Sequence, residues 1–257
     1  MRRLGYPITE AIDHEGWRVQ YFQRGRLEVH PENHPDYFIT VGWLGQLSHR
    51  TQPPLPAPPN STARFFPKTG HTVNGDFLTF FLDNGGTVQF GQPISEPFIH
   101  NGLLNQDFQS ARFIWQPSLP APARVQLEPL GETHFLSGDL PLSLLEPVSP
   151  PPGVDVYAPD TAPLPANWRA HLRLEATPRT GVVRVVATLS AGGRPVVNYA
   201  PHLLWGDGER ALPATEPGGQ THTLVHLARQ ANTKFVLRDG PAGAVLASVE
   251  YAPPGAP

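Results

Sequence analysis

Short apolar runs broken by turn-forming clusters fill the last third of the chain. From Trp168 onward, clusters such as AGGRP, EPGGQ and DGPAGA separate runs that read WRAHLRLEA, GVVRVVATLS, PVVNYAPHLLW, QTHTLVHLA, TKFVLRD and AVLASVEY. Strands that recur about every ten residues with turns of this kind are typical of a β-sandwich. We therefore predict an immunoglobulin-like β-sandwich over residues 167–252.

One segment has a helical pattern instead. Apolar side chains fall at helical spacing there, and two glycines follow as a stop signal. The residues concerned are Val73, Phe77, Phe80, Phe81, Gly85 and Gly86. The pattern predicts a short amphipathic helix around residues 74–83. Elsewhere 32 Pro and 24 Gly residues disfavour long helices, because proline removes a backbone donor. The expected fold class is mainly β: hairpin-containing repeats with one short helix, plus the C-terminal sandwich.

A long pattern occurs twice in the chain. LGYPITEAIDHEGWRVQYFQRGRLEVHP, residues 4–31, matches FGQPISEPFIHNGLLNQDFQSARFIWQP, residues 90–117, without a gap, so equivalent residues lie 90 − 4 = 86 positions apart. We expect two superimposable hairpins. Because nothing like the predicted helix precedes the first copy, we expect a partial first repeat, and a chain that is a fragment or has a misplaced start.

Two Pro-rich stretches, TQPPLPAPPN and a longer one that contains EPVSPPPG, predict extended linkers. The expected organisation is a partial repeat at residues 1–50, a linker at 51–61, a full repeat at 62–138, a linker at 139–166 and the sandwich at 167–252. We call residues 1–50 the first repeat and residues 62–138 the second repeat.

The motif elements TGH, NGG, F/LG-x-P-I-S/T-E and QYF-x-R-G/A-R recur across residues 1–50 and 62–135. Together they resemble a repeat of exported and surface-associated proteins of Chloroflexus-type bacteria, and more distantly the LGFP repeats of actinobacterial envelope proteins. The last third resembles bacterial immunoglobulin-like spacer modules through its strand rhythm and its GGRPV turn. These resemblances imply an extracellular or cell-surface module that engages cell-envelope polysaccharide or a surface protein, and they bring no catalytic residues.

Composition narrows the function further. A formal net charge of −3 gives nucleic-acid binding little electrostatic support, and no apolar run is long enough to span a bilayer. The absence of Cys excludes disulfides and Cys-zinc sites. The opening MRRLGYPITEAI lacks the apolar core of a signal peptide, so either the protein is cytoplasmic or an export signal lies outside this chain.

Candidate chemistry is sparse. The cluster HPENH, His30 to His34, could suggest a metal site, but Pro31 disfavours the helical arrangement and the equivalent positions hold Gln116 and Pro120. No GxSxG, HExxH, P-loop or dinucleotide-binding motif occurs. We expect no catalytic residue, no metal and no cofactor.

Glu10 and Arg26 keep the same spacing in both copies, as Glu96 and Arg112. We predict that each Glu and Arg form a charge-assisted structural pair, which we favour over ligand contact.

Trp17, Val19 and Tyr21 form an apolar stripe in the first copy, whereas the second copy has Leu103, Asn105 and Asp107. A stripe that the fold can omit is a candidate contact surface. It could face the other repeat, a partner, or a sugar ring stacked on Trp17 or Tyr21.

The sequence thus favours a non-catalytic binding or spacer protein. An accessory region of a secreted hydrolase, with its catalytic domain upstream, and a structural surface-layer or filament subunit are the alternatives.

Overall fold

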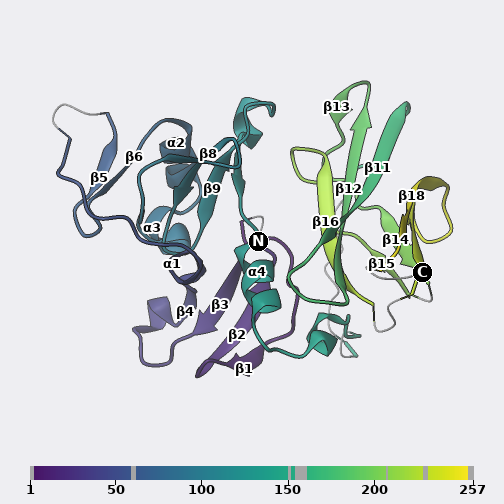
Figure 1. Ribbon diagram of the computed structural model, residues 1–257, viewed down its shortest axis with the longest axis horizontal. Helices are drawn as coiled ribbons and strands as arrows, with labels where there is room; N and C mark the ends of the chain where they lie inside the picture. The colour runs from purple at the N-terminus through teal and green to yellow at the C-terminus, as the bar shows by residue number, and fades with distance from the viewer. Residues whose placement is uncertain are drawn as a thin grey trace. The chain divides into compact units, whose positions relative to one another are not determined.

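The computed structural model describes residues 3–58, 62–149, 152–153, 161–206, 208–227 and 231–253. The chain divides into two compact units, residues 1–140 and 141–257 (Figure 1). The first unit contains both repeats, and the second contains the predicted sandwich. Antiparallel sheets dominate both units, so the predicted mainly β fold class is confirmed. No helix among the described residues is long and apolar enough to cross a membrane.

The first repeat forms a four-stranded antiparallel sheet in the order β1-β2-β3-β4. Glu15 and Gly16 both have positive φ angles and turn the chain between the first two strands. A short 3-10 helix and a short α-helix flank the last strand. The elements are β1 (Ile12–His14), β2 (Trp17–Phe22), β3 (Gly25–Val29), η1 (Pro35–Tyr37), β4 (Ile39–Val41) and α1 (Leu44–Ser48).

The second repeat forms a sheet with the same neighbours, β10-β9-β8-β7. The bridge between Pro7 and Phe22 has its equivalent between Pro93 and Phe108. Matching strands therefore carry matching residues in the two sheets. The elements are β7 (Phe98–His100), β8 (Leu103–Asp107), β9 (Arg112–Trp115), η2 (Ala121–Ala123), β10 (Val125–Leu127) and α4 (Leu130–Ser137).

The second repeat also contains a helical half that covers one face of its sheet. The helix predicted around residues 74–83 is present as α2 (Gly75–Asp83), after β5 (Arg64–Phe66) and β6 (His71–Val73). Its phenylalanines pack with those of the sheet in one core cluster. This helix ends at Asp83, just before the two glycines, but a further helix, α3 (Gly86–Phe90), begins at the second of them. The sequence predicted one helix, and the structure adds α1, α3 and α4.

Each of the helices α1 and α4 docks on the hairpin of the opposite repeat. The amide of Gln46 donates to the carbonyl of Gln109 at 2.9 Å, and the equivalent amide of Glu132 donates to the carbonyl of Gln23 at 3.1 Å. A Cβ atom added at Gly45 or Gly131 would collide with the facing hairpin backbone. Only glycine permits this approach, so the two repeats close into a single unit.

The predicted linker at residues 51–61 is anchored where the structure describes it, up to residue 58. The amide of Gln52 donates to the carbonyl of Ile94, and that of Leu55 to the carbonyl of Gly70, each at 2.8 Å. The segment therefore lies along the second repeat as an extended strap. Of the predicted linker at residues 139–166, positions 150–151 and 154–160 fall outside the described residues.

The second unit is a sandwich of two antiparallel sheets with an immunoglobulin-like strand order. β11, β12 and β16 form one sheet with the short β13, and β15-β14-β17-β18 form the other. Apolar residues from both sheets share one core cluster. The elements are η3 (Leu142–Leu145), β11 (Trp168–Ala176), β12 (Val182–Ala191), β13 (Arg194–Pro195), β14 (His202–Trp205), β15 (Gly208–Ala211), β16 (Gln220–His226), β17 (Thr233–Arg238) and β18 (Val245–Tyr251).

Candidate functional site

The two predicted ion pairs are wrong. Arg26 bonds Glu15 and Glu28, each at 2.6 Å, and Glu10 is exposed. The reason is the strand register: Arg26 lies directly across from Tyr21 and shares a sheet face with Glu28, whereas Glu10 precedes the sheet.

The same strand register determines the ion-pair partner of the arginine in the second copy. Arg112 lies across from Asp107 and forms a bidentate ion pair with it, in which the distance from Nη2 to Oδ2 is 3.0 Å. Glu96 instead accepts hydrogen bonds from the amide and the hydroxyl of Thr72, at 2.8 and 2.6 Å. In both copies the shared arginine thus bonds the residue that differs between the copies, Tyr21 or Asp107.

The predicted contact stripe lies mostly inside the protein. Val19 is 1% exposed and Tyr21 is fully buried, so neither can meet an external ligand, and the prediction of an accessible surface there is wrong for both. Tyr21 packs edge-on against Phe135 of α4, which belongs to the second repeat. Contact with the other repeat, one of the three alternatives, therefore accounts for Tyr21. Trp17 is half-buried, and its ring lies 4.1 Å from that of His30.

The phenol of Tyr21 is the centre of a closed polar cluster. Its oxygen lies 2.9 Å from Arg26 Nη1, 3.0 Å from His14 Nδ1 and 3.1 Å from His134 Nδ1. Burial raises the pKa of Tyr21, and burial together with the charge of Arg26 lowers the pKa of His134. In the first repeat, the neutral phenol of Tyr21 and the helix α4 therefore fill the space beside Arg26.

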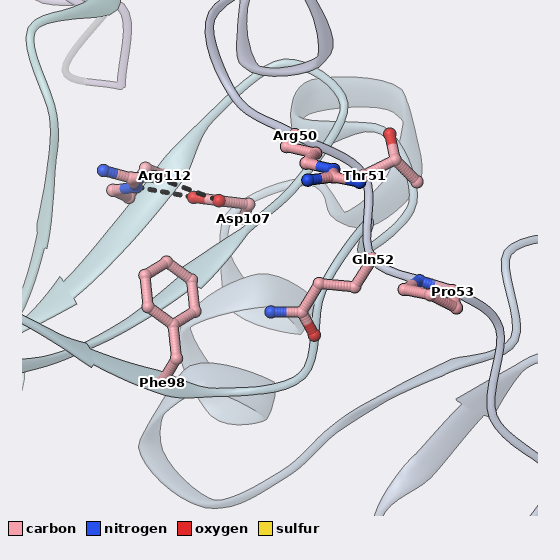
Figure 2. A pocket seen from close by; sticks show the side chains of 7 residues that line it. All are labelled: Arg50, Thr51, Gln52, Pro53, Phe98, Asp107 and Arg112. Carbon is pink, nitrogen blue, oxygen red and sulfur yellow. Dashed lines mark hydrogen bonds and ion pairs between the residues drawn. The ribbon is translucent and has the colours of Figure 1, made fainter.

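At the equivalent place the second repeat is open. Asp107 replaces the larger Tyr21. The helix α1 is also shorter than its equivalent: α1 ends at Ser48, whereas α4 ends at Ser137, which corresponds to position 137 − 86 = 51 in the first repeat. A cavity of about 390 Å³ results (Figure 2). Its lining residues are Arg50, Thr51, Gln52, Pro53, Phe98, Asp107 and Arg112. We call this cavity the second-repeat pocket.

The charged pair and the aromatic ring form one wall of the second-repeat pocket. The Asp107 and Arg112 side chains are mostly buried, with 4% and 11% of their surface exposed. The guanidinium carbon of Arg112 lies 5.4 Å from the centre of the Phe98 ring. This cation–π contact and the ion pair hold the wall in a fixed geometry.

The anchored strap forms the opposite wall. The carbonyl of Gln52 accepts from His71 Nε2 at 3.2 Å, and its side-chain oxygen accepts from the amide of Glu96 at 3.1 Å. These contacts fix the side chain so that its amide nitrogen points into the cavity (Figure 2). Arg50, which also lines the cavity, is exposed and has no bonded partner among the described residues.

The second-repeat pocket offers an aromatic face, a fixed ion pair, an amide and an unpaired guanidinium, which are groups suited to binding. Within the described ranges, no group of three or more His, Asp or Glu side chains could hold a metal ion. Sequence reasoning missed this pocket. Asp107 in place of Tyr21 was the available signal, since a smaller residue at a buried position leaves space.

Comparison of the chain with protein-family models, with curated proteins and with solved structures found no match.

Proposed function

We propose that this chain is a non-catalytic, extracellular or cell-surface binding protein in which the repeat unit engages cell-envelope polysaccharide and the sandwich serves as a spacer. The observation that carries the proposal is the second-repeat pocket, with Phe98 on one wall and Gln52 on the other. The resemblance of the motifs to envelope repeats supports the location.

The shape and lining of the pocket support a saccharide ligand. Pockets for small ligands have volumes of roughly 300–1,000 Å³, and about 390 Å³ falls within that range. An aromatic ring such as Phe98 offers a flat apolar surface against which the C–H face of a sugar ring packs. Polar groups opposite the ring then fix its orientation.

The contrast between the two repeats supports the same conclusion. The first repeat fills the equivalent space with Tyr21 and α4. The fold therefore tolerates a filled site, and the cavity in the second repeat is not a requirement of the sheet.

Binding of the intact chain to isolated envelope polysaccharide tests the proposal. Phe98→Ala removes the aromatic wall and should weaken binding at least ~10-fold, as expected for a central anchor residue. Ile99→Ala is the matched control, since Ile99 is the next residue on β7 and 68% exposed. Thermal melting of both variants separates binding from folding.

Unchanged affinity of a folded Phe98→Ala variant would exclude the pocket as the binding site. Self-assembly of the intact chain without saccharide binding, seen by light scattering, would instead favour a structural surface-layer subunit.

A further inference from the structure

The free hydrogen-bonding groups of the second-repeat pocket are donors. Both carboxylate oxygens of Asp107 are engaged by Arg112, and the side-chain oxygen of Gln52 is engaged by the amide of Glu96. The groups left over are the amide nitrogen of Gln52 and the guanidinium of Arg50, and neither has a bonded partner among the residues that the structure describes. A site with free donors and occupied acceptors selects a ligand rich in acceptors.

The charged groups of the site show the same imbalance, because its carboxylates are paired and, among the described residues, one of its cations is not. Arg112 is matched by Asp107, and Glu128 outside the lining lies 3.1 Å from His49 and 3.5 Å from Arg112. Burial raises the pKa of Glu128, but His49 and Arg112 more than offset this effect, so the carboxylate stays ionised and held by both groups. Arg50 is the lining cation that lacks a carboxylate partner within the described chain.

The placement of the two donors suits a carboxylate. In Figure 2 the amide nitrogen of Gln52 points toward the space between Asp107 and Phe98, whereas the hydroxyl of Thr51 points away from it. Arg50 is an exposed lining residue beside Thr51, so its guanidinium stands at the edge of the pocket. A guanidinium presents paired N–H groups that match the two oxygens of a carboxylate, and such charge-assisted bonds are stronger than neutral ones.

We propose that the second-repeat pocket binds a carboxylate-bearing saccharide, with its sugar ring against Phe98 and its carboxylate bonded by Arg50 and the amide of Gln52. The inference rests on the proposed function and names the ligand class of the same site.

Isothermal titration of the intact chain with tri-galacturonate and with its methyl ester tests the inference, because esterification removes the charge of the carboxyl groups and leaves the sugar rings unchanged. The acid should bind about tenfold more tightly, equivalent to ~1.4 kcal/mol. Arg50→Gln should abolish this preference. Arg18→Gln, which removes an exposed arginine of the first repeat, should retain it.

Equal binding of acid and ester would overturn the carboxylate while leaving a saccharide-binding pocket in place. A preference for the acid that survives Arg50→Gln would overturn the contact between the carboxylate and Arg50. Tri-glutamate binding as tightly as tri-galacturonate would overturn the saccharide. Failure of the chain to bind either probe together with failure to bind envelope polysaccharide would overturn the proposed function itself.

Discussion

The backbone amide of Gln46 donates a 2.9 Å hydrogen bond to the carbonyl of Gln109, which fixes the short helix of the first repeat on the hairpin of the second. The reciprocal bond, from Glu132 to Gln23, fixes the helix of the second repeat on the hairpin of the first. Each repeat therefore supplies part of the packing that the other lacks. The second-repeat pocket owes its shape to this exchange, since the strap that lines it continues directly from α1.

Gly45→Ala and Gly131→Ala should each destabilise the repeat unit by roughly 1–3 kcal/mol, the usual cost of overpacking. The added methyl group would collide with the hairpin backbone, at Phe108 and Ala111 for Gly45. Gly138→Ala is the control, because a Cβ there makes only ordinary contacts. Urea denaturation measures the difference. A Gly45→Ala variant as stable as Gly138→Ala would show that the docking is looser than described.

Tyr21→Phe should cost about 1–2 kcal/mol, because it leaves Arg26 and His134 without the phenol oxygen in a buried site. Tyr21→Asp, which installs the second-repeat residue, should cost more, roughly 3 kcal/mol, because it also leaves a cavity beneath Phe135. Tyr37→Phe, at an exposed position, should change little. Chemical denaturation measures the stability of each variant. A Tyr21→Asp variant nearly as stable as the native chain would contradict the burial of this side chain.

The stability of the repeat unit should depend on the protonation of His30. Burial disfavours the charged ring, but hydrogen bonds to Glu32 at 2.9 Å and Glu28 at 3.0 Å outweigh it, and the pKa of His30 is raised. A raised pKa in the folded state stabilises the fold fully below the unfolded pKa, about 6.5, and the contribution disappears as pH rises through the folded value.

His30→Gln should remove this part of the pH dependence, which sets in above about pH 6.5, whereas His34→Gln, at an exposed neighbour, should leave it in place. Denaturation midpoints at a series of pH values provide the measurement. Identical pH profiles for the native chain and His30→Gln would rule out the coupling.

The sandwich should fold without the repeats, because its core cluster draws on the second unit alone. A fragment of residues 141–257 should melt cooperatively. A fragment that starts at residue 161 should be less stable, since it loses Leu145 of η3, which is 6% exposed and lies beside β16. A non-cooperative melt of the longer fragment would mean that the sandwich depends on the repeats.

The sequence predicted those elements whose own side chains determine them. α2 was predictable from the spacing of Phe77, Phe80 and Phe81, and the sandwich from strands and turns that repeat locally. The helices α1 and α4 were not, because five and eight residues make a weak helical pattern and their stability comes from glycine contacts with the other repeat.

The candidate site was harder to predict for a related reason. A constant spacing between Glu10 and Arg26 says nothing about which residue lies opposite in the sheet, and the register places Tyr21 there. The second-repeat pocket joins a strand residue, Phe98, to a strap residue, Gln52, whose position depends on long-range backbone bonds.

Mapping of amide chemical shifts in the intact, 15N-labelled chain during titration with tri-galacturonate tests the central claim most directly. We expect saturable shifts gathered at Arg50, Thr51, Gln52, Phe98 and Arg112, and loss of these shifts in Phe98→Ala. Shifts gathered around Trp17 and His30, or on the sandwich strands, would place binding elsewhere and contradict the assignment of the second-repeat pocket as the saccharide site.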